Sequence, residues 1–269
     1  MKHIGAALIG FGVFAGIGCS SSAYPKVAAI YSTLASEAEP PVVTLETQTD
    51  FPATGKGEGQ CIIVGDLLLT AAHTQADVID ARNEPNLWLL GREIPFERLA
   101  MGLKPGSAVP MTEGEGDWTL SWEDFGRDWA LLRLGETVEL PGGRVVVETG
   151  PIRALTKVSL FRGSTDGRYR QRLDTYTFHI TNPEEVPSNV IMLAKPEGFE
   201  AHGWSGSFVG RWSEADQAWR LIGLFVASPG GTLVQTGERI EGLLVVRPPA
   251  EILEWFASGG RGEMPETGP

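Results

Sequence analysis

Cysteine is almost absent from this chain of 269 residues, which contains only Cys19 and Cys61. Cys19 belongs to a leader-like segment at the N-terminus, so Cys61 has no partner in the mature chain and no intrachain disulfide is expected. The fold must therefore depend on a hydrophobic core, and a chain of this length with 42% hydrophobic residues can build one. In the run QCIIV, Cys61 itself is expected to be a small buried apolar residue.

Basic residues are also scarce. Lys and Arg number 22 against 34 Asp and Glu, which gives a formal net charge of -12 and a pI near 4.8. Such a chain repels polyanions, so nucleic acid is not an expected partner. The sequence has no H-E-x-x-H motif and no paired cysteines to bind zinc, and the acidic run TEGEGD reads as a solvated loop. Neither a metal nor a cofactor is predicted.

No apolar run is long enough to span a bilayer permanently. The glycine-rich run Ile4–Gly18 follows Lys2 and is typical of a secretion signal over residues 1–18. The residues GIGC resemble the bacterial lipobox, in which the cysteine, here Cys19, becomes the lipidated first residue, and cleavage after Ala23 is the alternative. The sequence therefore predicts an exported protein, either secreted or in the bacterial cell envelope, with membrane contact only through a lipid anchor.

The remaining chain predicts one all-β unit between less structured ends. Residues 19–41 are expected to form a tether with a short helix, because Val27, Ile30, Tyr31 and Leu34 have helical spacing before two prolines. From residue 42, short β-branched and apolar runs alternate with Gly, Pro, Asn and Asp, which is typical of a sandwich or barrel. Near the end, PPAEILEWFAS predicts a helix, and residues 258–269 are expected to be disordered.

Three separate stretches carry residues that together suit nucleophilic catalysis. In LLLTAAHTQAD, His73 ends an apolar run, where a lone histidine is usually structural unless an acid and a nucleophile elsewhere match it. In AHGWSGSFVG, Gly203 and Gly206 flank Ser205 and let the backbone turn N–H groups toward a reacting oxygen, although a plain Gly/Ser turn has the same composition. In GRDWALLRL, Asp128 precedes a strand, as a buried partner for imidazole or as an ordinary turn residue.

Taken together, LTAAH, DWALL and GWSGS resemble the signature stretches of the chymotrypsin/trypsin-like serine peptidases, and the order His, Asp, Ser agrees with that family. The resemblance covers residues 42–257. It implies an all-β fold of two packed six-stranded antiparallel β-barrels, divided near residues 140–155, with a C-terminal helix. The site would lie in the cleft between the barrels.

The resemblance also implies a reaction, the hydrolysis of peptide bonds in a protein or peptide substrate by a monomeric serine endopeptidase. His73 would take the proton of Ser205, Asp128 would orient the imidazole, and the N–H groups of Gly203 and Ser205 would form the oxyanion hole. The implied substrate-binding residues are Phe199, His202, Val226, Ala227 and Ser228. Phe199 at the pocket base indicates a preference for small or apolar side chains.

Three residues depart from the family pattern. Trp204 stands where an aspartate is usual, so the oxyanion hole must be preformed by packing. Ser207 replaces a second glycine, and its hydroxymethyl group could crowd the turn. Thr74 replaces the cysteine that commonly follows the histidine, which agrees with a chain without disulfides.

Two alternative functions share parts of this pattern, and one of them can be excluded. An α/β-hydrolase is excluded, because no histidine follows Ser205 and Ser207 stands where the G-x-S-x-G elbow needs glycine. The alternative that remains is a catalytically inactive pseudopeptidase, which keeps the double barrel as a binding module of the cell envelope. In that hypothesis Trp204 and Ser207 are signs of a decayed oxyanion hole.

Overall fold

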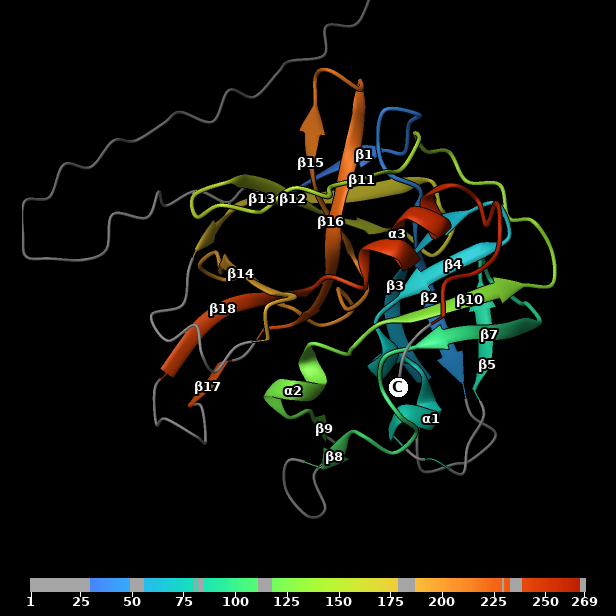
Figure 1. The fold of residues 1–269 in the computed structure, drawn as a ribbon, viewed down its shortest axis with the longest axis horizontal. Coiled ribbons are helices and arrows are strands. Elements are labelled where there is room, and N and C mark those ends of the chain that lie inside the picture. Colours follow the sequence, from blue (N-terminus) through green and yellow to red (C-terminus); the bar gives the residue numbers. More distant parts are fainter. Residues whose placement is uncertain are drawn as a thin grey trace, which may run out of the picture.

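The computed structural model describes residues 30–48, 56–79, 81, 85–110, 118–178, 187–228, 230–232 and 239–266, which form two β-sheets, a two-stranded ribbon and short helices (Figure 1). The predicted signal over residues 1–18 and the lipidation candidate Cys19 lie outside these residues. Within the described part, no helix is long and apolar enough to cross a membrane.

The first sheet contains seven antiparallel strands in the order β6-β5-β2-β3-β4-β10-β7. The strands are β2 (Val42–Gln48), β3 (Lys56–Val64), β4 (Leu67–Thr70), β5 (Asn86–Leu89), β6 (Arg92–Glu93), β7 (Phe96–Met101) and β10 (Ala130–Leu134). Gly65 has a φ of +66° in the tight turn between β3 and β4, a conformation that favours glycine. Buried side chains including Val43, Leu45, Ile63 and Leu68 pack together, so the sheet curls around its own core.

The second sheet closes into a six-stranded barrel, β16-β15-β12-β13-β14-β18, because β18 also pairs with β16. The strands are β12 (Lys157–Gly163), β13 (Tyr169–Phe178), β14 (Val190–Ala194), β15 (Phe208–Ser213), β16 (Ala218–Ala227) and β18 (Arg239–Val246). The shorter β11 (Val146–Val147) and β17 (Gly230–Thr232) extend this sheet, and β8 (Val109–Pro110) pairs with β9 (Trp118–Thr119) as a separate ribbon. Leu160, Val209, Ile222 and Phe225 are among the buried residues of the barrel.

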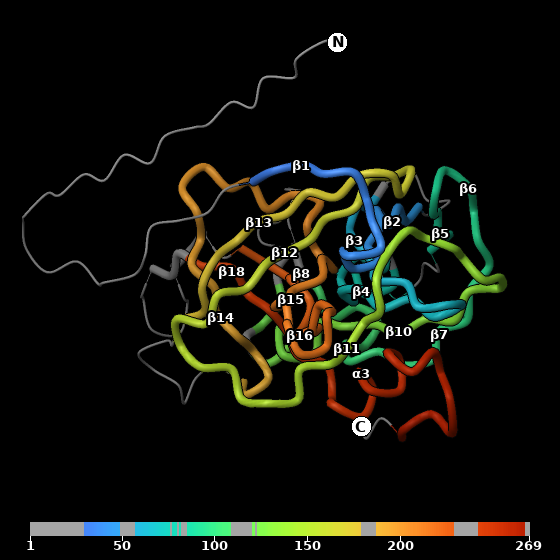
Figure 2. The backbone as a smooth tube through the Cα atoms, turned by 90° about the horizontal axis from the view of Figure 1, so that it is seen from above, coloured from blue at the N-terminus to red at the C-terminus, as the bar shows by residue number. Residues whose placement is uncertain are grey.

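A third apolar cluster joins the two sheets. It contains Ile62 and Leu131 from the first sheet, Phe208 from the second, and Trp255 and Phe256 from the helix α3 (Ala250–Ala257). Burying a side chain such as Phe256 contributes about 1.5–3 kcal/mol. In both views α3 lies beside the junction of the sheets (Figures 1 and 2). The predicted all-β architecture of two packed barrels with a C-terminal helix is thereby confirmed, with the first barrel present as a curled sheet.

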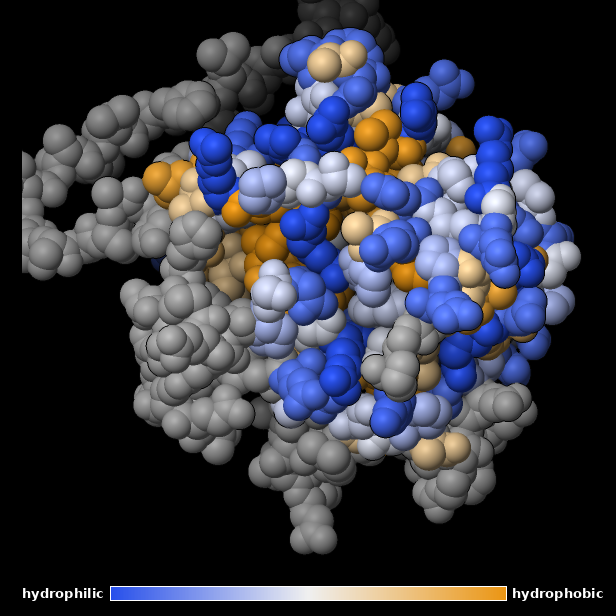
Figure 3. All heavy atoms as spheres, viewed as in Figure 1, coloured by the Kyte–Doolittle hydropathy of each residue, from blue (hydrophilic) through white to orange (hydrophobic). Residues whose placement is uncertain are grey.

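Hydrophilic and apolar residues are distributed unevenly over the described surface (Figure 3). Figure 3 shows hydrophilic residues over most of the described surface on one face, with apolar residues gathered near its centre. The chain passes from the first sheet to the second between β10 and β12, along residues 135–156.

The segment predicted as a tether with a short helix differs from that prediction. Ile30–Leu34 forms strand β1, antiparallel to β13, with Ile30 opposite Leu173. β14 pairs only with the end of β13, at Thr177 and Phe178, which leaves the beginning of β13 open to another strand. The helical spacing was misleading because no neighbour buries the apolar side chains, and Leu34 is 70% exposed.

The prediction of a disordered tail is wrong as far as residue 266. The chain turns back on α3 after Ala257, where Gly260 has a φ of +74° and its N–H donates to the carbonyl of Trp255 at 3.0 Å. Met264 then packs against the shared core. Gly259, with a φ of +73°, ends the helix, and the packing of Met264 together with the hydrogen bond from Nε1 of Trp255 to the carbonyl of Gly262 at 3.2 Å holds the segment against α3. Residues 267–269 lie outside the described part.

Candidate active site

His73 lies in a turn directly after β4. The turn is the 3-10 helix η1 (Ala72–Thr74), in which the N–H of Gln75 donates to the carbonyl of Ala72 at 2.8 Å. Ala71 and Ala72 are fully buried, whereas the side chain of His73 is 29% exposed. The turn therefore ends the buried strand and brings the imidazole to the surface of the first sheet.

Asp128 contacts His73 with both carboxylate oxygens. It follows the short helix α2 (Trp122–Phe125), precedes β10 and is 0% exposed. Oδ1 accepts the backbone N–H of His73 at 2.8 Å, and Oδ2 lies 2.6 Å from Nδ1. A carboxylate can only accept, so Nδ1 carries the hydrogen and Nε2 is left as a proton acceptor. This is the tautomer that a general base needs.

Burial and the neighbouring carboxylate have opposite effects on the pKa of His73. Burial of the imidazole acts to lower the pKa of His73, but the negative charge of Asp128 and their hydrogen bond together outweigh burial. The pKa of His73 is therefore raised above 6.5. The buried carboxylate thus stabilises the imidazolium form.

Ser205 lies in a tightly turned loop of the second barrel. Gly203 and Gly206 have φ values of +73° and +87°, and the N–H of Ser207 donates to the carbonyl of Trp204 at 2.9 Å. A Cβ at Gly206 would lie 2.0 Å from the carbonyl oxygen of Gln60, so only glycine fits there. The sharp bend predicted from the glycines is present.

The loop of Ser205 and the turn of His73 pack against the same part of β3. The N–H of Gln60 donates to the carbonyl of Ser205 at 2.6 Å. A Cβ built on Gly59 would lie 2.6 Å from Cγ2 of Thr74 and 2.9 Å from the Ser205 carbonyl oxygen. His73 and Ser205, which are 132 positions apart in the sequence, therefore lie in neighbouring segments.

The hydroxyl of Ser205 has a different partner from the one that the sequence suggests. Its Oγ donates to the carbonyl of Val226 at 3.4 Å, a long hydrogen bond. Among the described residues no hydrogen bond joins this hydroxyl to His73. The structure therefore brings His73 and Asp128 into direct contact and Ser205 into the adjoining loop, without the serine–imidazole bond.

Trp204 and Ser207, which differ from the residues expected in the resembled pattern, are both buried. Trp204 packs edge-on against Phe199, with ring centroids 5.3 Å apart, inside the core of the second barrel. Ser207 is 0% exposed, and its φ is not in the left-handed region. Its hydroxyl has no hydrogen-bond partner in the described part of the chain. The indole of Trp204 therefore anchors the loop through apolar contacts.

The residues expected to bind substrate fall into two groups. Phe199 is 4% exposed and contacts Trp204 and Phe225, so it belongs to the barrel core, and Val226 is likewise buried. His202 is exposed, and Ala227 and Ser228 are half-buried. Of the five, only Val226 makes a recorded hydrogen bond to a candidate catalytic residue, through its carbonyl.

One buried polar residue near the loop was not found from the sequence. Gln60 is 0% exposed, and its side chain spans the two sheets. An ion pair lies beside it, in which Nη2 of Arg162 is 2.7 Å from Oε1 of Glu58. The only sequence signal was a polar residue directly before the apolar run Cys61–Val64.

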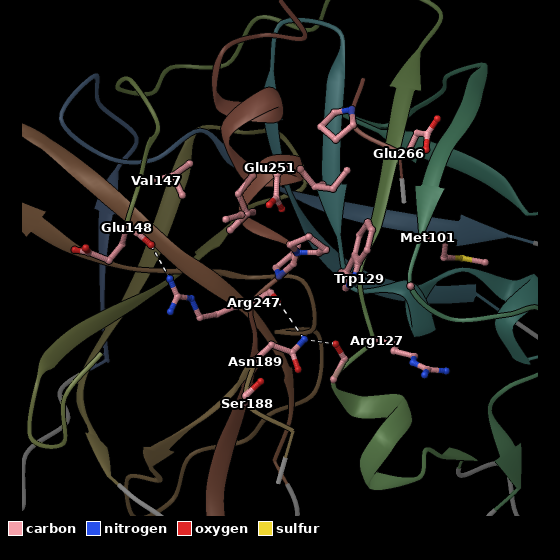
Figure 4. Close-up of a pocket in the computed structure, with 18 of the residues that line it drawn as sticks. Met101, Arg127, Trp129, Val147, Glu148, Ser188, Asn189, Arg247, Glu251 and Glu266 are labelled. Carbon is pink, nitrogen blue, oxygen red and sulfur yellow. Dashed lines mark hydrogen bonds between the residues drawn. The ribbon is translucent and has the colours of Figure 1, made fainter. Parts of the chain in front are cut away.

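A cavity of about 1000 Å³ lies next to the segment that carries Asp128 (Figure 4). Gly126, Arg127 and Trp129 line it, and His73 and Ser205 do not. Nδ2 of Asn189 donates to the carbonyl of Gly126 at 2.5 Å, and Arg247 lies beside it, so the cavity wall fixes the turn before Asp128. Among the described residues no group of three or more His, Cys, Asp or Glu could hold a metal.

Comparisons with known proteins find solved structures that are similar to this chain. No family model and no curated protein matches it. The scabies mite inactivated protease paralogue S-I1 is 12% identical, with 80% of this chain and 93% of that chain covered at a TM-score of 0.47. The secreted serine protease VesC from Vibrio cholerae is 10% identical, with 80% and 45% covered at a TM-score of 0.46. At these values the likeness adds no argument about activity.

Proposed function

We propose that the protein is a serine endopeptidase that uses His73, Asp128 and Ser205. The observation that carries the proposal is the doubly hydrogen-bonded contact between His73 and a fully buried Asp128, which is oriented to leave Nε2 free as a base. Among the described residues Asp128 has hydrogen bonds only to His73, and a buried carboxylate is costly unless it is paired in this way. A buried acid–base pair of this kind is a candidate functional site. The tightly bent loop of Ser205 supports the proposal, because it packs against β3, as does the turn of His73.

In the proposed mechanism, the Ser205 hydroxyl leaves the carbonyl of Val226 and turns toward Nε2 of His73. Its oxygen attacks the carbonyl carbon of the scissile peptide while His73 takes the proton, and Asp128 stabilises the imidazolium. The C–N bond then breaks, and the leaving amine receives the proton from His73. Water, activated by the same imidazole, hydrolyses the acyl group and restores the hydroxyl.

The oxyanion would be bound by the N–H groups of Gly203 and Ser205. Neither N–H has a hydrogen-bond acceptor among the described residues, so both are available to a substrate oxygen. Substrate specificity is proposed to favour small or apolar side chains, because Phe199, which lies in the barrel core beside Trp204, offers no negative charge beneath the loop to pair with Lys or Arg. Best cleavage after arginine in a panel of fluorogenic peptides would contradict this preference.

A fluorophosphonate probe tests the proposal, because it reacts covalently only with an activated serine. We expect labelling of the wild type, loss of labelling in Ser205→Ala, and strong reduction in His73→Ala. Circular dichroism of all three proteins controls for folding. Labelling that persists in Ser205→Ala would contradict the assignment of the nucleophile.

The second candidate function is a binding module that has lost catalysis. The observation that favours it is the hydrogen bond from Ser205 to Val226 in place of one to His73. A wild-type protein that is folded but unlabelled by the probe would support this alternative. Both functions fit export to the bacterial envelope or secretion, with Cys19 as the proposed lipid attachment site.

A further inference from the structure

The carboxamide of Gln60 connects the two sheets at the loop of Ser205. Gln60 lies on β3 of the first sheet. Its Oε1 accepts the N–H of Gly163 on β12 at 2.9 Å, and its Nε2 donates to the carbonyl of Gly203 at 2.9 Å. Nε2 also lies 3.3 Å from Oγ1 of Thr44. An N–H can only donate and a carbonyl can only accept, so these partners fix the orientation of the amide. Every hydrogen-bonding group of this fully buried side chain has a partner.

The backbone of Gln60 holds the other end of the same loop. Its N–H donates to the carbonyl of Ser205 at 2.6 Å, and its carbonyl accepts the hydroxyl of Thr70 at 2.7 Å. That carbonyl also closes the space in which a side chain at Gly206 would stand. One residue of the first sheet therefore contacts the loop of Ser205 in the second barrel at Gly203, Ser205 and Gly206.

These contacts fix alternate peptide units of the loop. The unit between Gly203 and Trp204 is held by Gln60 at its C=O and by the carbonyl of Ala201 at its N–H, 3.1 Å away. The unit between Ser205 and Gly206 is held by Gln60 at its C=O and by the carbonyl of Phe225 at its N–H, 2.7 Å away.

The peptide units that precede Gly203 and Ser205 carry two N–H groups that have no acceptor among the described residues. Each unit is bounded by a fixed unit, and the unit before Ser205 is also held at its C=O by the N–H of Ser207, 2.9 Å away, which limits how far these N–H groups can turn. An oxyanion hole depends on donors that are held in place before the reaction begins.

We propose that Gln60 is the positioning residue of the oxyanion hole, which it holds in shape from the opposite sheet. This inference rests on the proposed function, because it assigns the two N–H groups to an oxyanion. It also accounts for the presence of a buried amide in an apolar strand. With Trp204 packed in the barrel core, Gln60 supplies the polar anchor of the loop.

The test compares three variants. Gln60→Met keeps the length of the side chain but can neither donate to Gly203 nor accept from Gly163. Gln60→Glu keeps the shape: when protonated it can donate to Gly203 and still accept from Gly163, and when ionised it cannot donate. Thr44→Val is the matched control, since it removes a buried hydroxyl that contacts Gln60 but not the loop.

Two readouts separate positioning from a merely structural role. In hydrolysis of an activated ester, Gln60→Met is expected to lower kcat about 100-fold with KM changed less than about threefold, because donors to the oxyanion act in the transition state. Gln60→Glu is expected to recover activity relative to wild type as the pH falls. In hydrogen exchange followed by mass spectrometry, residues 199–207 should exchange faster in both Gln60 variants than in Thr44→Val.

The outcomes distinguish this inference from the proposed function. If the wild type neither hydrolyses the ester nor reacts with a fluorophosphonate, the proposed function fails, and the exchange of residues 199–207 still decides whether Gln60 positions the loop. Exchange and kcat in folded Gln60→Met equal to those of Thr44→Val would overturn the inference. If Gln60→Met does not fold, the same comparison is made with Gln60→Glu, and a pH profile and exchange identical to wild type would overturn it.

Discussion

Replacing Asp128 with asparagine is expected to reverse the tautomer of His73. The backbone N–H of His73 needs an acceptor and is 2.8 Å from Oδ1, so the amide oxygen of the asparagine must remain there. The amide nitrogen then takes the place of Oδ2, 2.6 Å from Nδ1 in the native protein. Because that nitrogen donates, Nδ1 must become the acceptor and the proton moves to Nε2. Nε2 can then no longer accept the proton of Ser205.

The expected loss is about 10⁴-fold in kcat, which is the size of the effect when the wrong tautomer is forced in such a triad. This corresponds to about 5.5 kcal/mol in the activation barrier. The assay is the rate of fluorophosphonate labelling at neutral pH, with near-UV circular dichroism as the measure of folding. Asn and Asp have nearly the same volume, so packing is preserved.

Asp77→Asn provides the matched control. Asp77 is also buried, and its carboxylate pairs with Arg98 at 2.7 Å and has no hydrogen bond to His73 in the described part of the chain. We expect it to label at close to the wild-type rate. A folded Asp128→Asn protein that labels less than about tenfold more slowly than wild type would refute the tautomer argument.

Three further predictions follow from particular contacts. kcat/KM should rise with pH at a midpoint above 6.5, because the pKa of His73 is raised, and Asp128→Asn should lower that midpoint in a pH-rate profile. The stability that the His73–Asp128 contact contributes is complete below pH 6.5 and is lost as the pH rises through the raised pKa of His73, which urea unfolding at several pH values measures. Gly206→Ala should abolish labelling and lower the melting temperature in calorimetry, because its Cβ would lie 2.0 Å from a carbonyl oxygen of Gln60. Arg170→Met should reduce the free energy of unfolding in urea by at least about 2 kcal/mol, because the fully buried guanidinium donates to four backbone carbonyls and those of Gly167 and Pro141 have no other donor among the described residues; an unchanged midpoint would contradict this.

The sequence predicted those parts of the molecule that local patterns determine. Short apolar runs between turn residues predicted the strands, because this pattern is visible within each strand's own sequence, and Pro249 with the spacing of Ile252 and Phe256 predicted the helix α3. The glycines around Ser205 predicted a sharp bend because few other residues adopt a positive φ. The pairing of His73 with Asp128 followed from comparing their contexts and not from either alone.

Contacts between distant segments could not be predicted in the same way. Ile30–Leu34 becomes a strand only because β14 leaves part of β13 unpaired, which depends on the barrel as a whole. The amide of Gln60 reaches Gly203 across 143 positions of the chain, and nothing near it in the sequence indicates that partner. Met264 orders the end of the chain because the shared core lies within its reach. Each of these depends on tertiary packing, which local propensity does not encode.

The central claim is that Ser205 becomes acylated with the help of the His73–Asp128 pair. Rapid mixing with a p-nitrophenyl ester, followed by acid quenching and peptide mass spectrometry, measures this directly. The account predicts a burst of nitrophenol close to one equivalent per chain, an acyl group on Ser205, and neither in Ser205→Ala. A folded wild-type protein that gives no burst, or that carries the acyl group on another residue, would contradict it.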